Sequence, residues 1–430
     1  MKHVRLSRLD RRRAFVIAGA LATGAIGACV TTSFDDGKYA CTPGANAVCP
    51  EGLLCARDGR CRTQELPNVD DGGEPDTSIV DAGTDTNVDC SNARWRTLLD
   101  ARAPEGVEVR ADGRVFTVGT AGTQGWIAEI DRCTGAVLKE RTILAEQQTS
   151  TAFRSVASQG DDLVVAGGSR GPDGGQVYHG KFSLDLEPAT PTDRSKLPEG
   201  EAQRIAIGSD GTNWLIGSQV GGGFVTRVGS TICSASVPSI PGGIAPRDTG
   251  AADFMRDGNP ATLSFVDSVC AVSASPQTLA VGTGNVDVTS LIAARGSLIA
   301  TGTANGTLPN TYFWIAESKT GATTFTYATL DPNTLDRDTG RRVVFDGESL
   351  FVLASQRASF NSGTPTLYRY NGAITFSSKP FWATTPFGPV LLEVRDLAVA
   401  PTGGDAVYVT AATTTTGGIA RCTKAGECQP

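Results

Sequence analysis

The segment Arg204–Gly217 decides the fold class of this chain. It reads Arg-Ile-Ala-Ile-Gly-Ser-Asp-Gly-Thr-Asn-Trp-Leu-Ile-Gly, which is two short runs of strand-forming residues on either side of an Asp-Gly dipeptide. Asp-Gly between two such runs predicts a β-hairpin, and a type I′ turn would use its positive φ angles. We therefore predict a hairpin whose second strand is the more apolar and ends in small residues.

Similar hairpins recur along the chain. Clear copies lie at 107–119 and 342–353, looser copies at 154–167, 289–302 and 395–410, and a weak copy near 253–266. The string Trp-Ile-Ala-Glu, followed by Thr-Gly-Ala, occurs at 126–129 and again at 314–317. The two copies are about 188 residues apart, or about four repeats of about 47, and a period in the forties with four strands per repeat is typical of propeller blades.

These repeats predict an all-β domain over residues 94–430, a β-propeller of about seven four-stranded blades. The pattern resembles bacterial β-propeller repeat proteins, a resemblance that implies a fold but no ligand. An all-β sandwich array is the alternative, and it would not need a constant period. Because the chain ends soon after the third strand of the last blade, at 418–421, we predict that Trp95–Leu99 supplies the outermost strand of that blade and closes the ring.

Residues 1–28 are predicted to be a signal peptide. Six basic residues within 1–13 precede an uncharged run at 14–28 that is too short for a permanent transmembrane helix. Ile26-Gly27-Ala28-Cys29 resembles the lipobox of bacterial lipoproteins, which implies cleavage before Cys29 and its acylation. The alternative is an ordinary cleavage site with a free thiol at Cys29. The string at 12–16 also resembles the twin-arginine export motif, and Val30 after the cysteine favours the outer membrane.

The cysteine count supports export independently. Of the eleven cysteines, ten remain beside Cys29, an even number suited to disulfides in an oxidising compartment. Zinc binding is the alternative for the four cysteines between 41 and 61, but these lack a Cys-x-x-Cys pair. We predict the pairs Cys90–Cys133, Cys233–Cys270 and Cys422–Cys428, and two bridges of open connectivity within Cys41, Cys49, Cys55 and Cys61.

Two segments separate the lipobox from the propeller. Residues 29–66 have too few apolar side chains for a core, so bridges must hold them, and the string at 49–61 resembles the cysteine-rich modules of myxobacterial lipoproteins. Its Asp58-Gly59 turn would bring Cys55 and Cys61 together. Residues 67–93 are acidic, without a basic residue, and predict a disordered linker. Calcium binding is the alternative there, but the acidic residues lack EF-hand spacing.

Several kinds of chemistry are disfavoured. The net charge is −7, and it is more negative once the basic residues 1–28 are removed, which disfavours nucleic-acid binding. Outside the signal peptide the only histidine is His179, so a His-based metal site or a Ser-His-Asp triad is not expected. An acidic loop at 331–338 could hold calcium, but a solvated connection is the better interpretation. No cofactor and no metal are predicted.

One constellation is a candidate binding site. Aligning the hairpins puts Arg154, Arg204, Arg342 and Arg395 at the start of four innermost strands, where equivalent positions would form a ring at one mouth of the central channel. Such a ring would bind anions. The alternative, which we favour, is that each arginine pairs with an acidic residue of a neighbouring blade, with Glu201 and Glu393 nearby.

Two functions remain open at this point. The first is a non-catalytic binding or scaffold protein, anchored to the membrane through its lipid in the cell envelope, with a protein or glycan partner. The second is a cell-envelope enzyme, a lyase or glycosidase, that uses the axial cleft. Propellers host both kinds of function, so the fold does not decide. Converging carboxylates in the axial funnel would favour the enzyme.

Overall fold

The computed structural model describes most of the chain from residue 92 onward, together with residues 54–55, 61–62 and 90. The gaps after residue 92 are 173, 190, 193, 249, 274–276, 282–283, 306–310, 320–323, 330–337, 360–361, 376–377, 389–391, 402–403, 414–415 and 429–430. The chain divides into two compact units, 1–83 and 84–430.

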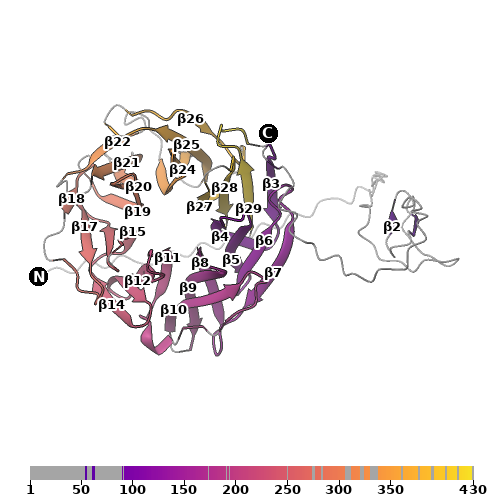
Figure 1. Ribbon diagram of the computed structural model, residues 1–430, viewed down its shortest axis with the longest axis horizontal. Helices are drawn as coiled ribbons and strands as arrows, with labels where there is room; N and C mark the ends of the chain where they lie inside the picture. The colour runs from indigo at the N-terminus through magenta and orange to yellow at the C-terminus, as the bar shows by residue number, and fades with distance from the viewer. Residues whose placement is uncertain are drawn as a thin grey trace, which may run out of the picture. The chain divides into compact units, whose positions relative to one another are not determined.

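The larger unit is a ring of seven antiparallel sheets, the blades of a β-propeller (Figure 1). Among the described residues, six blades have four strands and blade 2 has three, so the predicted fold is confirmed. From the innermost strand outward, the blades are as follows: blade 1, β4 (Arg102–Val109), β5 (Val115–Ala121), β6 (Gln124–Ile130) and β7 (Val137–Ile143); blade 2, β8 (Ser150–Gln159), β9 (Asp162–Gly171) and β10 (Gly174–Ser183); blade 3, β11 (Glu201–Ile207), β12 (Asn213–Gln219), β13 (Gly222–Val228) and β14 (Ile232–Val237); blade 4, β15 (Pro241–Pro246), β16 (Ala252–Arg256), β17 (Ala261–Val266) and β18 (Gln277–Leu279); blade 5, β19 (Val286–Ala294), β20 (Ser297–Asn305), β21 (Thr311–Lys319) and β22 (Thr326–Thr329); blade 6, β23 (Thr339–Phe345), β24 (Ser349–Ser359), β25 (Ser362–Asn371) and β26 (Trp382–Thr384); blade 7, β27 (Glu393–Val399), β28 (Val407–Ala412), β29 (Gly417–Cys422) and β3 (Trp95–Leu99).

Blade 2 covers its outer edge without a regular fourth strand. The segment after β10 makes two isolated bridges to it, Phe182 with Pro188 and Gln176 with Glu199, and contains the short 3₁₀ helix η1 (Arg194–Lys196). These contacts occupy the backbone edge that a fourth strand would otherwise pair with.

The hydrophobic core is divided among the seven interfaces between neighbouring blades. Each of seven clusters of buried side chains joins two adjacent sheets, and the last joins blade 7 to blade 1. Trp126, Trp214 and Trp314 are fully buried in three of these clusters. Stability therefore depends on every sheet having two neighbours, which only a closed ring provides.

Ring closure follows the prediction from the sequence. β3 pairs with β29 as the outermost strand of blade 7, with Trp95 opposite Arg421 and Leu99 opposite Gly417 (Figure 1). The Trp95 indole packs near Tyr408 and donates a hydrogen bond from Nε1 to the carbonyl oxygen of Arg132 at 3.0 Å. The first strand of the domain thus ties the last blade to the first.

The three predicted disulfides of this unit are present. Cys90–Cys133 attaches the chain before β3 to blade 1, with a Cα–Cα distance of 5.2 Å. Cys233–Cys270 joins blades 3 and 4 at 5.8 Å, and Cys422–Cys428 closes the C-terminal end at 4.2 Å.

Two details of the hairpins differ from the prediction. The Asp-Gly turns are not type I′, because a type I′ turn needs two successive residues with positive φ and here only the glycine has one. In the first hairpin, for example, the carbonyl oxygen of Arg110 accepts a hydrogen bond from the Gly113 amide, so Gly113 (φ 81°) is the fourth residue of the turn. In blade 4 the weak copy at 253–266 is one strand out of step: it covers β16 and β17, whereas the innermost strand is β15. That strand reads Pro-Gly-Gly-Ile-Ala-Pro and lacks the usual strand-forming composition.

In the smaller unit the structure describes a two-residue ladder, β1 (Leu54–Cys55) with β2 (Cys61–Arg62). Its register places Cys55 opposite Cys61, as the turn between them predicted. The bridges within Cys41–Cys61, the lipidation site Cys29 and most of the linker lie outside the described residues. In the part of the chain that is described, no helix has the length and apolarity to span a membrane.

Candidate functional site

A β-bulge interrupts the innermost strand of every blade at the same level. In each case two residues of the inner strand face one residue of the second strand, and one inner residue is left unpaired. A bulge redirects the unpaired side chain, here toward the channel. In blade order the bulge residues are Glu105, Arg154, Gln203, Gly242, Thr289, Arg341 and Arg395, and all seven line one axial pocket of about 340 Å³.

The sequence carries a signal for these bulges that the hairpin alignment did not use. Glycine occupies the second strand opposite the residue before the bulge in four blades, at Gly119, Gly167, Gly217 and Gly302. A Cβ at Gly119 would collide with the carbonyl oxygen of Ala103 in the inner strand, and Gly217 is crowded in the same way by Glu201. A glycine within a strand often marks a bulge.

The four predicted arginines line the channel, but they do not form one ring. Arg154 and Arg395 are bulge residues, whereas Arg204 and Arg342 each follow a bulge residue and lie one level further along the channel. The prediction of a single ring is therefore wrong, because the alignment counted residues without the bulges. Each of the four arginines has an acidic partner, but not always in a neighbouring blade: Arg154 pairs with Glu201 of blade 3, Arg395 with Glu393 of its own strand, and Arg204 of blade 3 with Asp396 of blade 7.

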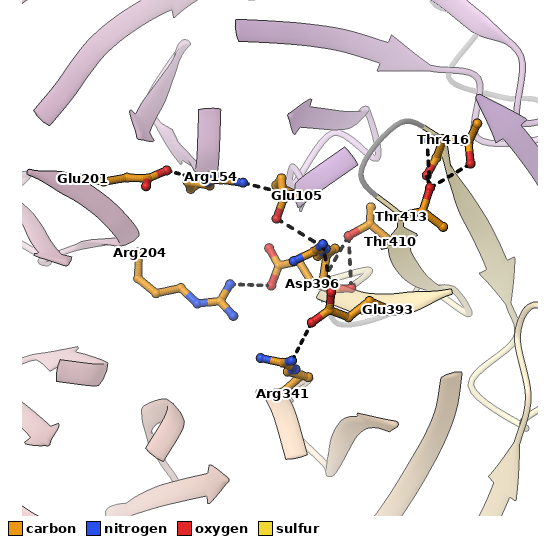
Figure 2. Close-up of polar contacts among 11 residues, drawn as sticks. Glu105, Arg154, Glu201, Arg204, Arg341, Glu393, Asp396, Thr410, Thr413 and Thr416 are labelled. Atoms are coloured by element: carbon orange, nitrogen blue, oxygen red, sulfur yellow. Dashed lines mark hydrogen bonds and ion pairs between the residues drawn. The ribbon is translucent and has the colours of Figure 1, made fainter. Parts of the chain in front are cut away.

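Six side chains of alternating charge follow one another at one side of the pocket, and all but Glu393 belong to its lining. We call them the charged arc, and Figure 2 labels all of them except Arg395. In order they are Arg341, Glu393, Arg395, Glu105, Arg154 and Glu201, with successive N–O distances of 2.9, 3.1, 3.6, 3.0 and 2.5 Å. Three positive and three negative charges balance, so the arc by itself does not concentrate anions.

At the centre of the arc, burial and the neighbouring charges shift the pKa values of Glu105 and Arg154 in opposite directions. Burial raises the pKa of Glu105, while Arg395 and Arg154 act in the opposite direction. Burial alone would lower the pKa of Arg154, but the carboxylates of Glu105 and Glu201 outweigh it and raise that pKa. Both partners gain from the pairing because each would otherwise be desolvated without compensation.

The opposite side of the pocket has one charged residue in its lining, Arg204. Its bulge residues are Gln203, Gly242 and Thr289. The Thr289 hydroxyl is occupied, because it lies within hydrogen-bond distance of the carbonyl oxygens of Thr301 (3.1 Å) and Gly340 (2.9 Å). Gly242 has no room for a Cβ, which would collide with the carbonyl oxygen of Val288. Gln203 is exposed and has no side-chain partner among the contacts of the described residues.

One level further along, a buried carboxylate links blades across the channel. Asp396 of blade 7 has a side chain that is only 2 % exposed, and it pairs with Arg204 of blade 3 and Arg342 of blade 6, each at 3.1 Å (Figure 2 shows the Arg204 contact). Its other oxygen accepts from the backbone N–H of Val107 in blade 1 at 3.2 Å. We call Asp396, Arg204 and Arg342 the Asp396 cluster. Burial lowers the pKa of Arg204 to about 10, with Asp396 acting against it, so Arg204 remains charged at neutral pH.

Two further cavities adjoin these groups. A groove of about 650 Å³ shares Arg154 and Glu201 with the axial pocket and extends over blades 1 to 3. Its walls are mostly small residues at the ends of β5, β9 and β12 and the starts of β8 and β11. Another cavity, of about 350 Å³, lies further along the inner strands and includes Arg204 and Arg342.

His179 lies away from the channel. Its ring is buried between blades 2 and 3, with Nδ1 2.7 Å from Thr192 Oγ1 and Nε2 3.2 Å from Asn213 Nδ2. Burial lowers its pKa to about 4, so it is neutral at physiological pH and has a packing role. Of the acidic loop at 331–338, the structure describes only Asp338. Within the described residues, no group of three or more His, Cys, Asp or Glu side chains is arranged to hold a metal ion.

Comparison with known proteins assigns the fold and no more. No family model matches the chain, and no curated protein matches it either. Among solved structures it is similar to virginiamycin B lyase from Staphylococcus aureus, in a catalytically inactive histidine-to-alanine variant with quinupristin and in a selenomethionine-substituted form. Each match has 13 % identity and a TM-score of 0.50 and covers 76 % of this chain and 99 % of the lyase. The fold is a β-propeller. At this identity the likeness does not extend to activity.

Proposed function

We propose that this chain is a non-catalytic binding protein of the cell envelope, anchored by a lipid on Cys29. Its propeller offers the axial pocket and the adjoining groove to a protein or glycan partner. The observation that carries the proposal is the charged arc, because a pocket lined by paired guanidinium and carboxylate groups is suited to polar recognition. The lipobox and the even number of remaining cysteines support the location.

The arc argues against acid–base catalysis. Glycosidases need two carboxyl groups free to exchange protons or attack the sugar. In the charged arc, Glu105, Glu201 and Glu393 are each held by at least one arginine within 3.1 Å. A carboxylate oxygen held by a guanidinium is not free to approach a glycosidic bond.

A lyase or glycosidase remains the second candidate, for one specific reason. Burial raises the pKa of Glu105, and a raised pKa is a property of carboxyl groups that act as general acids. The fold likeness to virginiamycin B lyase does not add to this candidate. An inactive variant of that protein carries a histidine-to-alanine change, whereas His179 of this chain lies outside the channel.

The anchor is tested by Cys29→Ala. We expect wild-type protein to sediment with membranes and the variant to be recovered in the soluble fraction, since no other segment of the mature chain is proposed to hold it there. Mass spectrometry of the N-terminal peptide should show the acyl groups on wild-type Cys29. Soluble wild-type protein with an unmodified Cys29 would disprove the anchor.

The binding function is tested with the full-length protein in detergent, on arrays of glycans and of purified secreted proteins. We expect at least one partner to bind, and Arg154→Ala to weaken it by about tenfold or more, because Arg154 borders both the pocket and the groove. Lys139→Ala, at an exposed position on β7, should leave binding unchanged. A bound compound recovered with unchanged mass supports a binding protein; a cleaved product establishes the enzyme instead.

A further inference from the structure

We propose that the axial pocket binds the uncharged terminal sugar of a glycan, with the charged arc holding vicinal hydroxyl groups. The inference rests on the proposed function and names the ligand class of the same site.

The charge balance of the arc disfavours an ionic ligand. Each arginine of the arc already has a carboxylate partner, at N–O distances from 2.5 to 3.1 Å. A ligand carboxylate that used the remaining donors of an arginine would lie close to the glutamate already paired with it, so two negative charges would be brought together in a partly buried site. An uncharged ligand incurs no such cost.

The hydrogen-bonding capacity of the arc matches hydroxyl groups. A carboxylate only accepts and a guanidinium only donates, and the ion pairs leave part of each capacity unused. Neighbouring members of the arc therefore present an acceptor beside a donor, repeated from blade to blade. A hydroxyl both donates and accepts, so adjacent hydroxyls of a sugar ring can satisfy both groups of one pair.

One link in the arc is longer than the others. The Arg395–Glu105 contact measures 3.6 Å, too long for a hydrogen bond, and Arg395 Nε is buried without an acceptor among the described residues, so a ligand hydroxyl would reach this pair through Glu105, which lines the pocket. The facing wall supplies the exposed amide of Gln203, which also donates and accepts.

The size and continuity of the cavities favour the end of a glycan. A volume of about 340 Å³ is at the small end of ligand sites, which span roughly 300–1,000 Å³. The lining is mostly polar and has no aromatic residue among its described members, which disfavours an apolar ligand. The adjoining groove, which shares Arg154 and Glu201, gives the following sugars a path over blades 1 to 3.

The test uses an array of neutral and acidic glycans with full-length protein in detergent, followed by calorimetry with the neutral glycan retained best and with hexagalacturonate. We expect wild-type protein to bind neutral glycans and not hexagalacturonate. Glu105→Gln should weaken neutral binding by about tenfold. The same change leaves Arg154 and Arg395 in excess, so it should create measurable binding of hexagalacturonate.

Two further variants keep the result interpretable. Glu187→Gln, at an exposed position outside the pocket, should change neither affinity. Gln203→Ala should weaken neutral binding about threefold or more without lowering the melting temperature, since its side chain has no structural partner. This variant serves if Glu105→Gln does not fold.

Three results would overturn the inference: wild-type binding to acidic glycans alone, no retention of any neutral glycan, or neutral binding that neither pocket variant alters. Retention of an acidic glycan or of a protein at the pocket would still leave the binding function in place. Absence of every partner on both arrays would remove the binding function as well.

Discussion

Asp396→Asn is expected to lower the free energy of unfolding by about 3–5 kcal/mol. The substitution preserves the shape of the side chain but removes the carboxylate that pairs directly with both Arg204 and Arg342. Both guanidinium groups are mostly buried, at 15 % and 24 % exposure, so both would lose a direct carboxylate partner in a poorly solvated site. Urea denaturation followed by tryptophan fluorescence measures the loss.

Two comparisons isolate the cause of that loss. Asp161→Asn, at a fully exposed position with a 3.9 Å contact to Arg110, should change stability by less than about 0.5 kcal/mol. Replacing the whole Asp396 cluster with Leu at 396 and Met at 204 and 342 should recover most of the stability, because no unpaired charge then remains. An Asp396→Asn protein as stable as wild type would show that the cluster does not hold the blades together.

Deletion of residues 94–100 should lower the melting temperature by about 10 °C or more, whereas deletion of residues 67–88 should leave it unchanged. The first deletion removes the outermost strand of blade 7 and with it Trp95 and Leu99, each 5 % exposed, from the cluster that joins blades 7 and 1. Loss of a buried tryptophan alone costs about 3–5 kcal/mol. The edge of β29 would also lose its backbone partner.

Calorimetry of the two deletions in the full-length protein makes this measurement. Trp95→Ala gives an intermediate variant that keeps the strand but removes the indole and its hydrogen bond to Arg132. Equal melting temperatures for the two deletions would show that β3 does not contribute to closure.

Local sequence patterns were sufficient to predict the blades. An apolar run, an Asp-Gly turn and a second apolar run are features of neighbouring residues, and their period does not depend on tertiary contacts. Trp126 and Trp314 lie in the third strands of blades 1 and 5, as their spacing predicted. Blade 4 was placed one strand out of step because β15, with its glycines and prolines, carries little of that local signal.

The candidate site could be predicted only in part. Arg154 and Arg395 were correctly placed at the channel, but Glu105 and Arg341, which complete the arc, were missed. A bulge shifts the register by one residue, so counting residues from the hairpin turn does not identify the inner-strand residue that faces the channel. The repeated glycines of the second strands, such as Gly119 and Gly217, were the available signal.

By itself, the sequence determined the strand pattern, the closing strand and the cysteine pairs of the propeller. The strands follow from the period of the repeats, and the pairing of the cysteines follows from their even number and their spacing. Only the tertiary structure decided which charges meet. The arc joins residues from five blades, and Asp396 contacts Arg204 from a position 192 residues away in the chain. Ion pairs depend on distance in space, and that distance is set by the closure of the ring and by the bulge in each inner strand.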